Sequence, residues 1–259
     1  MTDAGARDTL VLQSFRPTGA PDWIDRCLRS VRSWAAAHGH SYLQMDDALF
    51  DIVPPWFAER CGGARLPITD LARLLWIRRF LREGWRRIIW LDADVLVTRP
   101  AAFAPDPVHR HAVGREYWLR RGEDGALIGE WAVTNCGLAF TAESALLDFY
   151  IETAEAIVRG SGSVHPLTLG PRLLTPLGLI APLPLIPDLA TSSPLLTAEI
   201  AGGVASEVTA AHRAAWRAPV NAVHFCGSTA GASDGPAQIA EAIVARAIDR
   251  LAADPGLIG

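Results

Sequence analysis

The sequence predicts a single α/β domain with a central sheet, mixed but mostly parallel, flanked by helices. A short apolar strand, an amphipathic helix and a second strand follow one another over residues 9–44, which is the order of a βαβ unit. A continuous apolar run at residues 88–91 then has the composition of a strand buried on both faces, and two aspartates follow it. Both features are typical of a doubly covered parallel sheet.

The first half of the chain supplies most of these elements. Residues 9–15 are the first predicted strand, and a helix follows whose apolar positions recur every three or four residues until Gly39 ends it. Residues 41–44 form the second strand. Residues 47–66 are rich in proline and glycine, so we predict an irregular loop over the sheet edge.

A second helix is predicted from Pro67, which suits a first turn, to residue 83, where Gly84 stops it. The strand at 88–91 comes next. Further strands are predicted at residues 112–116 and 131–140.

The second half predicts a helix at residues 144–159 and a final strand at 220–226. Residues 164–194 are rich in proline and leucine, which favours turns and short extended pieces. No repeat or low-complexity segment suggests a second domain. We therefore expect one domain with a nucleotide-binding half at 8–100, an acceptor-side half at 101–235 and a C-terminal helix at 236–252.

The composition excludes several chemistries. All 24 basic residues are arginine, so lysine Schiff-base enzymes, P-loops of the GxxxxGK[ST] type and kinase-type lysines are ruled out. The net charge of −4 does not favour nucleic-acid binding. Four cysteines without CxxC spacing are typical of buried thiols in a reducing compartment.

The first ten residues contain no apolar run of signal-peptide length, and no stretch of about 18 uninterrupted apolar residues occurs later. We expect a cytoplasmic protein, and peripheral membrane contact is compatible with the sequence.

Asp92 and Asp94 are the main candidates for chemistry. Two carboxylates just past a buried strand are costly unless a positive charge compensates them. Ala93 between them lets both turn toward one divalent ion, and oxygen ligands suit Mg²⁺ or Mn²⁺. The alternative is that the two aspartates cap a turn or a helix.

Three segments carry a family resemblance: DLAR at residues 70–73, IWLDADV at 89–95 and VHFCGS at 223–228. Together they resemble the nucleotide-sugar-binding region of GT-A-fold glycosyltransferases. The most similar motifs belong to retaining families, namely the galactomannan galactosyltransferase and mannan polymerase type and the DxD sugar-transferase family. The last segment is similar to their HFAG element. The lack of a membrane anchor resembles bacterial soluble members rather than Golgi ones.

The resemblance implies a site and a reaction. A hexose would pass, with retention, from a UDP- or GDP-sugar to a hydroxyl of a glycan, a lipid-linked molecule or a small molecule. Asp92, Asp94 and His224 would bind Mn²⁺ or Mg²⁺, and Asp94 and Asn135 would act in catalysis. The implied contacts to the nucleotide sugar come from Gln13, Ser14, Asp70, Arg73, Asp92, Ala93, Asn135, Gly137, Arg172 and Gly227.

Each of these residues also has an ordinary structural explanation. Asp70 and Arg73 are three residues apart, which suits an ion pair on a helix surface. His224 in an apolar strand is typical of a core histidine, and Asn135 or Gly227 of a turn. What favours the functional interpretation is that the elements occur together in the family's order.

The acceptor side is less defined. Residues 115–130 and 53–65 would shape it, Trp56, Trp118 and Trp131 offer indole faces, and Glu130 and Asp188 are candidate carboxylates. Two other classes remain as alternatives: a haloacid-dehalogenase-type phosphatase, which lacks its later GDxxxD element here, and a non-catalytic sugar-binding module.

Overall fold

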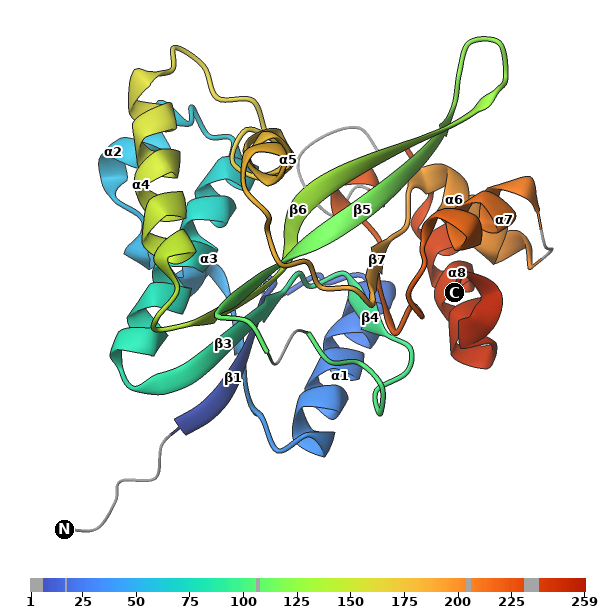
Figure 1. Ribbon diagram of the computed structural model, residues 1–259, viewed down its shortest axis with the longest axis horizontal. Helices are drawn as coiled ribbons and strands as arrows, with labels where there is room; N and C mark the ends of the chain where they lie inside the picture. The colour runs from blue at the N-terminus through green and yellow to red at the C-terminus, as the bar shows by residue number, and fades with distance from the viewer. Residues whose placement is uncertain (1–6, 17, 106–107, 204–205, 231–237) are drawn as a thin grey trace.

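A five-stranded sheet lies at the centre of the molecule. The computed structural model describes residues 7–16, 18–105, 108–203, 206–230 and 238–259 (Figure 1). The sheet order is β2 (Ser41–Met45), β1 (Arg7–Ser14), β3 (Trp85–Leu91), β6 (Leu127–Thr141) and β5 (His111–Arg121). β1 is parallel to β2 and β3, whereas β6 is antiparallel to β3 and β5. The predicted mixed α/β fold with a central sheet flanked by helices is confirmed, but the sheet is not mostly parallel, because two of its four strand pairings are antiparallel.

Both faces of this sheet are buried, as the apolar run of β3 predicts. Ile88 and Trp90 join the core cluster on the face covered by α2, α3 and α4. Ile89 and Leu91 point the other way, into a cluster shared with α1. Figure 1 shows α1 on one side of the sheet and α3 and α4 on the other. No described helix is long and apolar enough to cross a membrane.

The helices cover the predicted ones and add several more. Their bounds are α1 (Asp22–Ala37), α2 (Pro55–Arg60), α3 (Arg65–Arg82), α4 (Ala145–Gly160), α5 (Pro171–Ile180), α6 (Pro194–Gly202), α7 (Glu207–Ala215) and α8 (Glu241–Ala253), with 3₁₀ turns η1 (Asp47–Ile52), η2 (Gly227–Ala230) and η3 (Pro255–Leu257). Residues 236 and 237 of the predicted C-terminal helix lie outside the described residues, and α8 begins at Glu241.

The prediction of irregular structure is wrong for residues 47–66 and for the α5 part of residues 164–194, whereas β7 is one of the short extended pieces predicted there. Residues 47–66 contain η1, α2 and the start of α3, because Pro54 and Pro55 stand at the N-cap and first position of α2, where a missing N–H does no harm. Residues 164–194 contain α5 and β7, and Pro171 likewise stands at the first position of its helix. In both segments proline starts a helix instead of breaking one.

A small second sheet was not predicted. β4 (Val95–Val97), β8 (Ala222–His224) and β7 (Leu189–Thr191) pair in the order β4-β8-β7. β4 and β8 are antiparallel, with Val95 opposite His224. This pairing brings the C-terminal part of the chain beside the end of β3.

β5 and β6 form a hairpin longer than the two predicted strands. The pairing runs from Arg121 opposite Leu127 to His111 opposite Phe140, with an irregularity between Val113 and Gly114. Figure 1 shows the outer part of this hairpin extending well beyond the other strands. One side of the hairpin therefore lies over the carboxyl end of β3.

Candidate metal and nucleotide site

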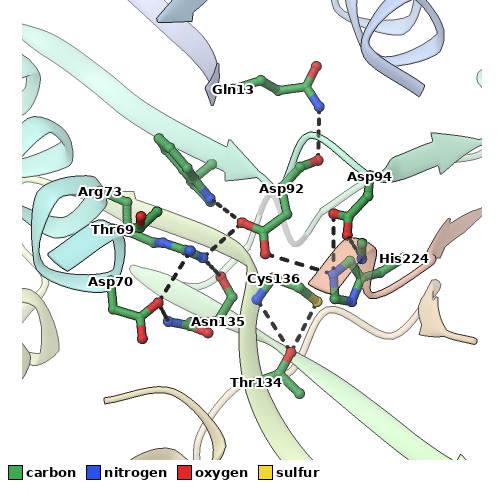
Figure 2. Close-up of polar contacts among 12 residues, drawn as sticks. Gln13, Thr69, Asp70, Arg73, Asp92, Asp94, Thr134, Asn135, Cys136 and His224 are labelled. Carbon is green, nitrogen blue, oxygen red and sulfur yellow. Dashed lines mark hydrogen bonds and ion pairs between the residues drawn. The ribbon is translucent and has the colours of Figure 1, made fainter. Parts of the chain in front are cut away.

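The carboxyl end of β3 presents Asp92 and Asp94 side by side (Figure 2). The backbone holds Asp92 firmly: its N–H donates to the Cys136 carbonyl at 2.8 Å, and its own carbonyl accepts from Gln13 Nε2 at 3.0 Å. Tyr42 in turn donates to Gln13 Oε1 at 3.0 Å. This chain of bonds ties the first aspartate to β6, β1 and β2.

His224 reaches the same point from β8. Its Nε2 lies 3.3 Å from Asp94 Oδ1 and 3.8 Å from Asp92 Oδ2. The other Asp94 oxygen accepts the backbone N–H of Gly227. Asp92, Asp94 and His224 each offer a ligand atom, and these atoms lie within 4.8 Å of one another.

The three side chains are strongly coupled electrostatically. Burial raises the pKa of Asp92, Arg73 opposes that effect, and the charge of Asp94 adds to it, so that the pKa of Asp92 is raised. For Asp94, burial also raises the pKa, but His224 and the Gly227 N–H outweigh it and the pKa is lowered. Burial lowers the pKa of His224, yet Asp94 and the nearby thiols raise it well above its usual value. Positive charge at this point stabilises the carboxylates.

A divalent cation fits this donor set. Two carboxylates and one imidazole are ligands that Mn²⁺ or Mg²⁺ accepts, and Asp92 keeps Oδ2 facing His224 while Oδ1 is occupied by protein donors. The imidazole Nδ1 lies 3.5 Å from Thr191 Oγ1 and 3.6 Å from Cys226 Sγ, so Nε2 is the nitrogen that faces the aspartates. The burial of the pair would be offset by such a cation.

Arg73 connects α3 to Asp92. Its guanidinium bonds Asp92 Oδ1 at 2.8 Å and the Asn135 carbonyl at 2.7 Å, and lies 3.2 Å from Asp70 Oδ1. Trp90 Nε1 donates to the same Asp92 oxygen at 2.8 Å. Arg73 is only 4% exposed, which makes it a positioning residue for Asp92.

Asp70 and Asn135 complete this buried network. Asn135 Nδ2 donates to Asp70 Oδ1 at 2.8 Å. Burial raises the pKa of Asp70 to about 6, although Arg73 and Asn135 act in the opposite direction. The prediction that Asp70 and Arg73 share one helical face holds, but the pair is buried beneath the site and is not a surface ion pair.

A pocket of about 650 Å³ opens above these residues. The lining includes eight residues predicted for the site besides His224: Ser14, Asp70, Arg73, Asp92, Ala93, Asp94, Asn135 and Gly227. A second cavity, of about 730 Å³, lies at the opposite ends of β1 and β3. Among the described residues, the metal-ligand cluster occurs only in the first pocket.

Three predicted site residues lie outside the pocket lining. Gln13 is fully buried and uses its amide to hold Asp92. Gly137 faces β7, where a Cβ would come within 2.5 Å of Leu189 Cδ2, so packing explains the glycine. Arg172 is exposed on the first turn of α5.

Sequence reasoning gave no role to Glu116, which lines the pocket, or to Cys226, next to His224. The period of two in a strand, which puts Glu116 on the same side as Trp118, is a signal that points to Glu116. Of the two predicted acceptor-side carboxylates, Glu130 lies at the pocket and pairs with Arg120 at 2.8 Å. Asp188 instead accepts from Asn221 Nδ2 at 3.0 Å and is buried elsewhere.

No protein-family model and no curated protein matches the sequence. Among solved structures, the chain is similar to a glycosyltransferase involved in the glycosylation of the major capsid of PBCV-1. The identity is 11%, the TM-score is 0.49, and the match covers 93% of this chain and 98% of that chain.

Proposed function

We propose that this protein is a metal-dependent glycosyltransferase that moves a hexose from a nucleotide-diphosphate sugar to an acceptor hydroxyl, with retention of configuration. The observation that carries the proposal is the convergence of Asp92, Asp94 and His224 in one pocket at the carboxyl end of a parallel strand. The GT-A resemblance of the same three residues in the sequence supports it.

The charges around the pocket support a role for a metal ion. Arg73 is the one arginine among the described lining residues, and its guanidinium already serves Asp70, Asp92 and Asn135. Lysine is absent from the chain. No arginine or lysine side chain of the described pocket lining is therefore free to neutralise a diphosphate. A bound cation would take that role.

The candidate site residues would have different roles in binding the cation and the donor. Asp92, Asp94 and His224 would hold Mn²⁺ or Mg²⁺, and Arg73 with Trp90 fixes which Asp92 oxygen faces the cation. A bound cation stabilises the negative charge that develops on the leaving diphosphate. Gly227 belongs to the same pocket wall and lacks a Cβ, so a phosphate can approach its backbone closely.

Calorimetry with a panel of UDP- and GDP-sugars, with and without Mn²⁺, tests the proposal. We expect binding of at least one donor that requires the cation and is lost in Asp94→Ala. Asp124→Asn, which changes an exposed aspartate in the β5–β6 turn, is the matched control and should bind as the wild type does.

Two results would contradict the proposal. Equal binding with and without the cation, unchanged in Asp94→Ala, would remove the metal-ligand assignment. Hydrolysis of p-nitrophenyl phosphate that depends on Asp92, without nucleotide-sugar binding, would favour the phosphatase class. Among the described residues, Asp92 Oδ1 accepts two hydrogen bonds and Oδ2 faces His224, which is the arrangement expected of a metal ligand.

A further inference from the structure

The β5–β6 hairpin builds one wall of the pocket, beside the candidate metal ligands. Successive side chains alternate between its two sides. Glu116 and Trp118 line the pocket, whereas Tyr117 and Leu119 belong to the core on the other side. Across the hairpin, Ala132 is opposite Glu116 and Glu130 is opposite Trp118, and both also line the pocket. The hairpin wall thus carries two carboxylates and two indoles, those of Trp118 and Trp131.

Glu116 stands out because it lacks a protein partner. It is partly buried, yet no described residue forms a hydrogen bond or ion pair with its carboxylate. Its carboxylate interacts electrostatically with His224 and Cys226, so Glu116 lies at the part of the hairpin that faces the candidate metal ligands. A half-buried, unpaired carboxylate is costly to keep unless a ligand supplies the missing donors. Glu130, by contrast, is already paired with Arg120.

Trp118 supplies an apolar surface next to this carboxylate. Its ring is partly exposed in the pocket, and no described group accepts a hydrogen bond from its indole N–H. Its neighbour Trp131 is different, since that ring packs against Tyr117 at 4.9 Å and Trp216 at 5.4 Å between ring centroids. An indole face beside hydrogen-bond acceptors suits a ligand with one apolar face and an edge of hydroxyl groups.

The charge of the wall restricts what this ligand can be. Five carboxylates line the pocket, from Asp70, Asp92, Asp94, Glu116 and Glu130. Two of them, Glu116 and Glu130, lie on the hairpin and are not among the three candidate cation ligands. An anionic group placed there would be repelled by Glu116, whose carboxylate forms no ion pair with a described residue. Hydroxyl or ammonium groups would instead donate hydrogen bonds to this carboxylate.

We propose that Glu116 and Trp118 form the binding site for the acceptor, and that the acceptor presents a neutral or amine-bearing sugar ring there, not an acidic one. The ring stacks on the Trp118 indole and donates a hydroxyl hydrogen bond to Glu116. This inference rests on the proposed function, since it gives the second substrate of the same pocket its chemical class.

Ligand-observed saturation-transfer NMR tests this site with small probes, in the presence of Mg²⁺ and either UDP or GDP. The probes are the methyl glycosides of glucose, galactose and mannose, together with glucosamine and glucuronate. We expect saturation of at least one neutral or amine-bearing probe, with glucuronate binding at least tenfold more weakly. Calorimetry of the nucleotide on the same samples reports the donor side separately.

The variants are Trp118→Ala and Glu116→Gln, with Trp85→Ala and Glu123→Gln as controls at positions outside the pocket. We expect Trp118→Ala to lower the affinity for the sugar about tenfold, because the stacking surface is lost. Glu116→Gln should lower it about fivefold, because a charged acceptor makes roughly twice as strong a hydrogen bond as a neutral one. Glu116→Gln should also reduce the discrimination against glucuronate. The controls should bind as the wild type does, and circular dichroism verifies that each variant is folded.

The outcomes separate the two proposals. Sugar binding that needs Trp118 and Glu116, in a protein that binds no nucleotide, would support this site and contradict the glycosyltransferase. Glucuronate binding as tightly as the neutral sugars, or folded Trp118 and Glu116 variants that bind like the controls, would overturn the acceptor site whatever the nucleotide result. Nucleotide binding without binding of any probe would also overturn it.

Discussion

Arg73 is a single residue on which the stability of the whole site depends. It is buried between Asp70 and Asp92, and both carboxylates depend on its charge. Breaking a buried ion pair by removing one partner typically costs about 3–5 kcal/mol, because the remaining charges stay buried without compensation.

We therefore expect Arg73→Ala to lower the free energy of unfolding by about 3–5 kcal/mol, measured by urea denaturation. The control is Arg29→Ala, which removes an exposed ion pair with Asp25 and should cost at most about 0.5 kcal/mol. An equal, small effect of both variants would show that the Arg73 network does not contribute to stability.

Individual site residues were predictable to different degrees. Asp92 and Asp94 follow from the buried strand before them, since burial on both faces leaves the carboxyl end as the place for polar groups. His224 depended on the family resemblance, because only the pairing of β4 with β8 brings it there. Gln13 shows the limit: its position at the end of β1 suggests a pocket, but its amide is used by the Asp92 carbonyl.

At the level of elements, the contact between β6 and β7 depends on a missing side chain. A Cβ on Gly137 would lie 2.5 Å from Leu189 Cδ2 and 3.1 Å from Ile186 Cδ1, and both neighbours are fully buried. Gly137→Ala should therefore destabilise the protein by about 1–3 kcal/mol in urea denaturation, as overpacking of a core does.

Gly160→Ala is the matched control for this prediction. Gly160 is the last residue of α4 and has open space where a Cβ would be. Alanine there should be neutral or stabilising by up to about 1 kcal/mol. If Gly137→Ala behaved in the same way, the close packing of β6 on β7 would be wrong.

The elements with a clear period were predictable, and those that depend on remote partners were not. The stripe of Trp23, Cys27, Val31 and Trp34 predicts α1, and all four residues are buried. β4, β7 and β8 are only three residues each, too short to show a period, and they exist because they pair with one another. The helices in the proline-rich segments were missed because proline at a first turn has the same sequence signature as proline in a loop.

At the scale of the whole molecule, the pH dependence of stability has a definable contribution from His212. This residue is fully buried, its Nδ1 bonds the Ile258 carbonyl at 3.0 Å, and its Nε2 has no hydrogen-bond partner among the described residues. Burial lowers the pKa of His212 to about 4, although the bond to Ile258 acts the other way. The unfolded chain therefore binds this proton more tightly than the folded protein does.

The contribution of neutral His212 to the free energy of unfolding is fully present above about pH 6.5 and is lost as the pH falls toward about 4. We expect the wild type to lose about 2 kcal/mol more between pH 7 and pH 5 than His212→Gln does, measured by urea denaturation at both values. His165→Gln, at an exposed position, is the control and should keep the wild-type difference. A wild-type difference in His212→Gln as well would contradict the assignment.

The candidate metal site can form only after β4 has paired with β8 during folding. Asp94 and Gly227, which bond each other there, are 133 positions apart in the chain. Closing so long a loop is slow compared with forming local helices, so the cation ligands come together late in folding. During synthesis, the aspartates leave the ribosome long before the histidine strand does. Binding at this site therefore reports that folding is complete, and in a nascent chain Asp94 lacks His224 and the Gly227 N–H until β8 is synthesised.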